Sequence, residues 1–431
     1  MASAFRCTPI RCSFAFDSHA VLRPSRRLHR PRSAGVATEL PSSWMSRSLG
    51  RRLYGKNSKD NEILASLARD STRTVIFEAP DVHRTLKPSI LRPFLFTIAC
   101  GLGTYGLAAY LTNVDSKKQE DKVREKSSSI FRRGVTSVEL AMARRGELVA
   151  DAKAFLRRHL GERPDINSAR TRIYTIVTEW WINNTEAQRT CIALIGVQAM
   201  VYLGWKVKPA FFSKAFTHYP LSGRSYTLLT STFSHSSGAH FLFNSIAFYS
   251  FGPTAMAYLW QPNREPGSDL KESTSKYHFL ALFATAGVVS ALFSHTYSLL
   301  YMLPRALMGS RSAAILPSLG ASGSIYATVV VTALTYPDNQ ISLIIFPFAS
   351  FPIGGGVAAL VAFDVLGLLS ARFRMLIARN LGIMLDHAGH LGGAACGWLA
   401  FHFGGPFFDS MRRLLGAQPK AKKDPVIALR R

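Results

Sequence analysis

Four polar residues in otherwise apolar surroundings are of the types that carry out acyl transfer. Ser322 stands in a glycine-rich stretch at residues 320–327, and His390 stands in a second one. A serine hydroxyl is a weak nucleophile until a base such as imidazole takes its proton. His240 and Asn244 are four residues apart, so on a helix they share one face, and their N–H groups could bind an oxyanion. These residues therefore indicate a nucleophile, a base and an oxyanion site.

Six apolar segments, each near the length that a membrane crossing needs, are expected to position these residues. They are expected at residues 190–206, 239–260, 277–303, 320–337, 341–365 and 388–407. Consecutive spans reverse direction, so the second, fourth and sixth start on the same membrane face. His240, Ser322 and His390 stand near those three starts. Because polar groups inside a membrane are costly, their shared depth favours a functional reading.

Small residues on the fourth and sixth segments predict close contact between two helices. Gly393 and Gly397 follow the histidine at helical spacing, while Gly320, Gly323 and Ala327 surround the serine. Small side chains at such spacing let helix backbones approach closely. We therefore expect the two helices to bring the hydroxyl and the imidazole to hydrogen-bond distance.

The N-terminal region differs in composition from the rest of the chain. Residues 1–55 contain ten arginines and two acidic residues, without the apolar block of a secretory signal. This composition is typical of a mitochondrial presequence, which we expect to be disordered. A polar segment is expected at residues 56–92.

The remaining parts complete an all-α polytopic membrane protein. Residues 93–113 are apolar and far from the other six segments, which predicts an extra transmembrane helix. Residues 114–188 carry charge of both signs and predict an amphipathic linker outside the bilayer, with residues 173–181 at the membrane surface. The core is expected at residues 189–408. A basic tail is expected at 409–431, disordered from Met411.

The net charge of +26 does not indicate nucleic-acid binding. Basic residues lie at the N-terminus, in loops and in the tail, as in targeted membrane proteins, and form no single face with interleaved aromatic residues. The five cysteines lack metal-ligand spacing, so we expect neither a metal nor another cofactor.

The motifs GASGSIYA, HFLFN and HAGHLGG together resemble the rhomboid family of intramembrane serine proteases. The extra helix and the presequence resemble its mitochondrial subgroup. The resemblance implies a six-helix core plus one N-terminal helix, a 1+6 arrangement. It implies Ser322 as nucleophile and His390 as base in a dyad. Tyr326 would stack on the imidazole, and His240 and Asn244 would line the oxyanion site.

The resemblance also implies an activity and a location. A member would hydrolyse peptide bonds in or near transmembrane segments of mitochondrial inner-membrane proteins, as a multi-pass protein of that membrane. Its substrates would be single-span or membrane-anchored proteins, with a mitochondrial dynamin-like GTPase as a candidate. The alternative is an inactive relative that binds membrane proteins and escorts them.

Four neighbouring residues are rivals or additions to the dyad. Ser324 lies about 200° around the helix from Ser322, so we expect it to point away from the base. His387 is expected outside the active centre. Asp364 or Asp386 could complete a triad, but the family's dyad favours a helix-end or loop contact for Asp364.

Overall fold

The described part of the chain begins shortly before the first apolar segment. A computed structural model describes residues 88–126, 135–162, 164–165, 167–260, 270–308, 315–343, 346–381 and 384–417. The chain divides after Tyr54 into two units, and all of these residues belong to the second. The expected presequence and most of the polar segment that follows it lie outside the described residues.

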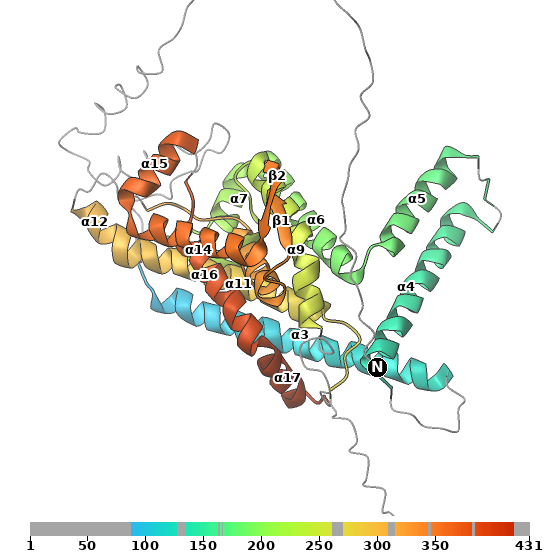
Figure 1. Ribbon diagram of the computed structural model, residues 1–431. Helices are drawn as coiled ribbons and strands as arrows, with labels where there is room; N and C mark the ends of the chain where they lie inside the picture. The colour runs from blue at the N-terminus through green and yellow to red at the C-terminus, as the bar shows by residue number, and fades with distance from the viewer. Residues whose placement is uncertain are drawn as a thin grey trace, which may run out of the picture. The chain divides into compact units, whose positions relative to one another are not determined.

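Within the described residues, three helices precede the core. They are α3 (Leu91–Lys126), α4 (Ser137–Leu160) and α5 (Ala169–Asn183). The apolar segment expected at 93–113 therefore continues as one helix of 36 residues into the charged region. Helix α4 begins with a capping box between Thr136 and Glu139, and it ends at Gly161, whose φ of 81° few other residues adopt. Helices α4 and α5 lie side by side (Figure 1).

The described part of the core consists mainly of helices. They are α6 (Glu186–Val207), α7 (Pro209–Phe216), α8 (Thr227–Thr230), η1 (Ser231–Phe233), α9 (Gly238–Leu259), α11 (Lys276–Tyr297), η2 (Ser298–Met302), α12 (Leu303–Leu307), α13 (Ser322–Thr335), α14 (Ile353–Leu369), α15 (Ala371–Leu381), α16 (His387–Leu399), η3 (Ala400–Gly404) and α17 (Gly405–Leu414). Helix α11 is central, because it packs against α3, α13 and α16, and α3, α11 and α16 run side by side (Figure 1).

Several of these helices are suited to a bilayer. Among the described residues, three are long and apolar enough to cross a membrane, at Leu91–Glu125, Glu186–Val207 and Lys276–Leu307. A fourth crossing is added if α14 and α15, which meet at a bend of 110°, count as one span. Helix α13 is apolar but shorter. The chain is therefore a helical membrane protein with several spans.

The segment expected as a helix at 341–365 is only partly helical, and this prediction was wrong in its first half. Strands β1 (Gln340–Leu343) and β2 (Phe346–Pro352) form an antiparallel hairpin there, with Ile341 opposite Phe351. Isoleucine and phenylalanine favour strands, and proline within the run disfavours a helix. Helix α14 starts only after Pro352, whose extended backbone precedes it.

The basic tail also departs from expectation, because its first residues are helical. Helix α17 continues to Leu414, so the prediction of disorder from Met411 was wrong for these residues. The Arg412 side chain is buried, and its Nε donates to Asn113 Oδ1 of α3 at 3.0 Å. This tertiary partner is remote in sequence, which is why the tail's own composition did not reveal it.

Helices α13 and α16 approach each other at glycine. A Cβ atom at Gly393 would lie 2.2 Å from the carbonyl oxygen of Gly323, and one at Gly397 would lie 2.6 Å from that of Ala327. Real Cβ atoms do not approach backbone oxygens so closely, so both positions require glycine. The expected close packing of these two helices is present in the structure.

We predict that Gly393→Ala destabilises the protein by about 3 kcal/mol and lowers any activity that needs both helices, because added bulk in a packed core forces backbones apart. Gly196→Ala is the matched control, since a Cβ there meets nothing within 4 Å among the described residues. Thermal unfolding in detergent measures both variants. Equal melting temperatures would contradict the close approach.

Candidate active site

Ser322 and His390 meet where α13 and α16 begin. Ser322 is the first residue of α13, and its Oγ lies 3.2 Å from Nε2 of His390. The chain enters α13 through Gly320, whose φ of 134° is one that residues with a side chain rarely adopt. The distance is that of a hydrogen bond from a nucleophile to its base.

The loop before the serine is held by backbone bonds to the first core loop. His218 and Ser318 exchange two backbone hydrogen bonds of 2.9 Å, and the Gly320 N–H donates to the Ser231 carbonyl at 3.0 Å. The His218 imidazole is buried between Thr227 and His295, at 2.8 and 2.9 Å. Burial, and to a smaller extent the neighbouring His295, lowers the pKa of His218 to about 3. The imidazole that supports the loop is therefore uncharged at neutral pH.

Asp364 of α14 is the third member of the cluster. It is 2% exposed, and its Oδ1 lies 3.2 Å from Nδ1 of His390. The same Oδ1 lies 2.7 Å from Nδ1 of His387, and Oδ2 accepts the hydroxyl of Tyr326 at 2.7 Å. An ionised carboxylate only accepts hydrogen bonds, so it keeps the proton of His390 on Nδ1 and leaves Nε2 free toward Ser322.

Tyr326 lies one turn after the serine, and its side chain contacts two members of the cluster, His390 and Asp364. Its ring is stacked on that of His390, with centroids 5.3 Å apart and an angle of 16° between planes. Its hydroxyl donates a hydrogen bond to the Asp364 carboxylate. Tyr326 therefore limits rotation of the imidazole from one side, as the resemblance implied.

His240 and Asn244 lie on α9, close to the serine loop. A Cβ at Gly320 would be 3.0 Å from His240 Nε2 and 3.8 Å from Ser322 Oγ, so the His240 ring borders this loop. His240 Nδ1 is 3.3 Å from the Ser236 hydroxyl. Asn244 donates one amide hydrogen to the His240 carbonyl at 2.9 Å, which leaves its second for another acceptor.

The structure shows where the alternatives and additions to the Ser322–His390 pair lie. Ser324 is buried and donates to the Phe283 carbonyl of α11 at 2.7 Å, away from the imidazole. Asp386 caps α16 by accepting the Gly389 N–H at 2.9 Å. The favoured expectation of a helix-end or loop contact for Asp364 was wrong, because its carboxylate lies against His390, as the alternative of a triad implied. The expectation for His387 was also wrong, because its side chain lies in the cluster against Asp364. The sequence offered a signal for His387, which stands one helical turn before His390 on the same face.

Among the residues that the structure describes, no group of three or more His, Cys, Asp or Glu side chains is arranged to hold a metal ion. The hydrogen bonds around Ser322 join proton donors and acceptors that contact one another directly. Such an arrangement can activate a hydroxyl by removing its proton.

We predict that His387→Phe lowers the catalytic rate of the cluster about tenfold, because a buried carboxylate loses a charged hydrogen bond. His387→Gln, whose amide can still donate to Asp364, should recover most of the rate. Single-turnover rates of substrate cleavage compare the two. Equal rates for both variants would mean that His387 only fills space.

The comparisons with known proteins agree on a family. Residues 222–406 match the family model of the Rhomboid domain. This part of the chain is a rhomboid domain, which confirms the resemblance noted from the motifs.

Relatives that are named as mitochondrial proteins occur in several organisms. The presenilin-associated rhomboid-like protein A, mitochondrial, of Danio rerio is 30% identical over 230 residues, which cover 52% of this chain and 50% of that protein. The human presenilin-associated rhomboid-like protein, mitochondrial, is 27% identical over 226 residues, covering 51% and 50%. Rhomboid protein 1, mitochondrial, of Saccharomyces cerevisiae is 27% identical over 222 residues, covering 50% and 53%. The chain thus spans about half the length of these relatives. No solved structure matches it.

Proposed function

We propose that the chain is an intramembrane serine protease that hydrolyses peptide bonds in or near transmembrane segments. The observation that carries this proposal is the contact of 3.2 Å between Ser322 Oγ and His390 Nε2 inside a rhomboid domain. An inactive escort protein would not need a serine placed against an imidazole that is itself held by a carboxylate.

In the proposed reaction His390 Nε2 takes the Ser322 proton as Oγ attacks the scissile carbonyl. The imidazole becomes a cation, and Asp364 stabilises it through the bond to Nδ1. His390 then gives the proton to the leaving amine, so the peptide bond breaks and an acyl-serine remains. Water, deprotonated by the same imidazole, hydrolyses this ester and regenerates the hydroxyl.

The oxyanion of each tetrahedral intermediate requires preorganised donors. The first N–H groups of α13 have no acceptor within the helix, and that of Ser322 itself is one of them. The Nε2–H of His240 and the second amide hydrogen of Asn244 are the further donors we assign. The Ser236 hydroxyl supports the first of these by donating to Nδ1 of His240.

The proposal extends to a location and to a class of substrates, and it is supported by the membrane-span candidates and by the mitochondrial relatives. We assign the chain to the mitochondrial inner membrane in the 1+6 arrangement, with residues 1–55 as its presequence. Its substrates would be single-span or membrane-anchored proteins, with a dynamin-like GTPase as one candidate. A helix hides its carbonyls, so the substrate must unwind locally before attack.

The test is cleavage by the purified chain in liposomes. A single-span substrate with a glycine or proline in its membrane helix should yield new N-termini within or beside that helix, detected by mass spectrometry. Stable binding of the substrate without any new N-terminus would support the escort function instead.

A further inference from the structure

The outward face of α5 is apolar, and its inward face is polar. Four exposed side chains, between 52% and 64% accessible, form what we call the α5 stripe: Ile173, Ile176, Val177 and Trp180. Their spacing places them on one side of the helix. The side toward α4 instead buries Thr171 and Thr178, and Tyr174 there stacks on Phe155 of α4. The α5 stripe therefore faces away from the packing of the described residues.

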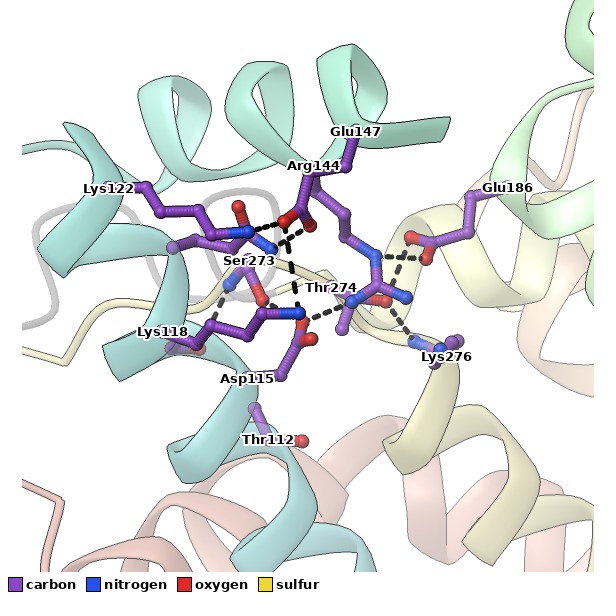
Figure 2. Close-up of polar contacts among 12 residues, drawn as sticks. Thr112, Asp115, Lys118, Lys122, Arg144, Glu147, Glu186, Ser273, Thr274 and Lys276 are labelled. Carbon is purple, nitrogen blue, oxygen red and sulfur yellow. Dashed lines mark hydrogen bonds and ion pairs between the residues drawn. The ribbon is translucent and has the colours of Figure 1, made fainter. Parts of the chain in front are cut away.

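The partner helix α4 is fixed to the core by charge. Figure 2 shows the Arg144 guanidinium between Asp115 of α3 and Glu186 of α6, with its Nε 2.8 Å from Glu186 Oε1. Burial opposes this charge, but Glu186 and Asp115 more than offset it and raise the pKa of Arg144. Glu186 also accepts from the Thr274 hydroxyl at 2.8 Å, and Asp115 from that of Ser273 at 2.6 Å.

A second contact lies one turn further along each helix. Glu147 of α4 forms an ion pair with Lys122 and accepts from Gln119 Nε2 at 2.5 Å, both on α3. In addition, the Glu272 N–H donates to Ser137 Oγ at the start of α4 at 3.2 Å. Helix α4 is thus tied to α3 and to the residues just before α11.

The corner between α5 and α6 is also closed by hydrogen bonds. Asn184 Nδ2 donates to the Trp180 carbonyl at 2.8 Å, and Arg189 donates to that of Trp181 at 3.3 Å. Tyr249 of α9 donates to Asn184 Oδ1 at 3.4 Å. These hydrogen bonds, together with those of α4, hold α5 with its stripe turned away from the other described helices.

We propose that the α5 stripe lies in the interfacial region of the lipid bilayer. Helix α5 ends at Asn183, and the membrane-span candidate α6 begins three residues later at Glu186, so the bilayer surface is next to the end of α5. Trp180 occupies the level at which tryptophan is enriched in membrane proteins. The Arg170 guanidinium is turned toward α4, where it donates to the His159 carbonyl at 2.9 Å, whereas the exposed Arg172 suits a lipid phosphate. The helical pair α4–α5 therefore rests on the membrane, held by the charge network in Figure 2.

Spin labels test this placement in the full-length protein. A single cysteine replaces Ile173, Ile176 or Val177 in a variant without the five native cysteines, and each nitroxide is measured in phosphatidylcholine nanodiscs that hold one copy. We expect collisions with dissolved oxygen, which concentrates in lipid, to exceed collisions with a water-soluble nickel chelate at all three positions. Asp151→Cys on exposed α4 is the matched control, where the chelate should dominate.

Two outcomes would overturn the proposal. Dominance of the chelate at the stripe would place it in water. Low collision rates with both reagents in these single-copy nanodiscs would mean that another part of the same chain covers the stripe. Circular dichroism and thermal unfolding of each labelled protein exclude misfolding as the cause.

Discussion

Replacing Ser322 by alanine is expected to reduce substrate cleavage by a factor on the order of 10⁴ or more, because no other hydroxyl contacts His390 among the described residues. The change removes one oxygen and leaves the stacking of Tyr326 on His390 intact. Folding should therefore be unchanged, and the melting temperature should match that of the unaltered protein. Cleavage of a co-reconstituted single-span substrate is the measurement.

Ser324→Ala is the matched control for this experiment. Its hydroxyl donates to the Phe283 carbonyl and has no contact with the imidazole, so cleavage should persist. Loss of one buried hydrogen bond should lower stability by about 1 kcal/mol. If Ser322→Ala retained cleavage while Ser324→Ala lost it, the nucleophile would be misassigned.

Replacing Asp364 by asparagine is expected to lower the catalytic rate by about 100-fold, or about 2.7 kcal/mol of transition-state stabilisation. The amide has nearly the same shape but loses the charge that stabilises the imidazolium. Its NH₂ group can also donate to Nδ1 of His390, which moves the imidazole proton to Nε2 and blocks acceptance from Ser322. The rate of the chemical step in single turnover is the measurement.

Asp386→Asn makes the same chemical change at the N-cap of α16, outside the cluster. Its amide oxygen can still accept the Gly389 N–H, so the rate should stay within a few-fold of the original. A full rate for Asp364→Asn would show that Ser322 and His390 act as a dyad and that Asp364 serves only packing.

The sequence predicted the principal pair because its signals are local. Glycines beside Ser322 and after His390 indicated close helix packing, and the structure has carbonyl oxygens of α13 against the Cα atoms of Gly393 and Gly397. Apolar runs of roughly membrane-spanning length likewise indicated helices in the regions of α6, α9, α11 and α16. Each of these inferences needs only spacing along one segment.

The parts that escaped prediction depend on contacts between distant segments. Asp364 is the single acidic residue of helix α14, which is otherwise apolar. No neighbouring residue in the sequence indicates that its carboxylate contacts Tyr326, His387 and His390 together. Hydropathy alone could not separate the β1–β2 hairpin from a helix, because apolar strands and apolar helices are equally hydrophobic. The phenylalanines and prolines of this segment are the signals that hydropathy leaves out. Arg412 was assigned to a disordered tail for a similar reason, since its partner Asn113 lies on α3.

The most direct test of the central claim is the mass of the protein after reaction with a fluorophosphonate or isocoumarin probe. An activated serine forms a covalent adduct, whereas an ordinary hydroxyl does not. We predict one adduct per chain, located by peptide sequencing at Ser322 and absent in His390→Ala. No adduct, or an adduct at Ser324, would contradict the account.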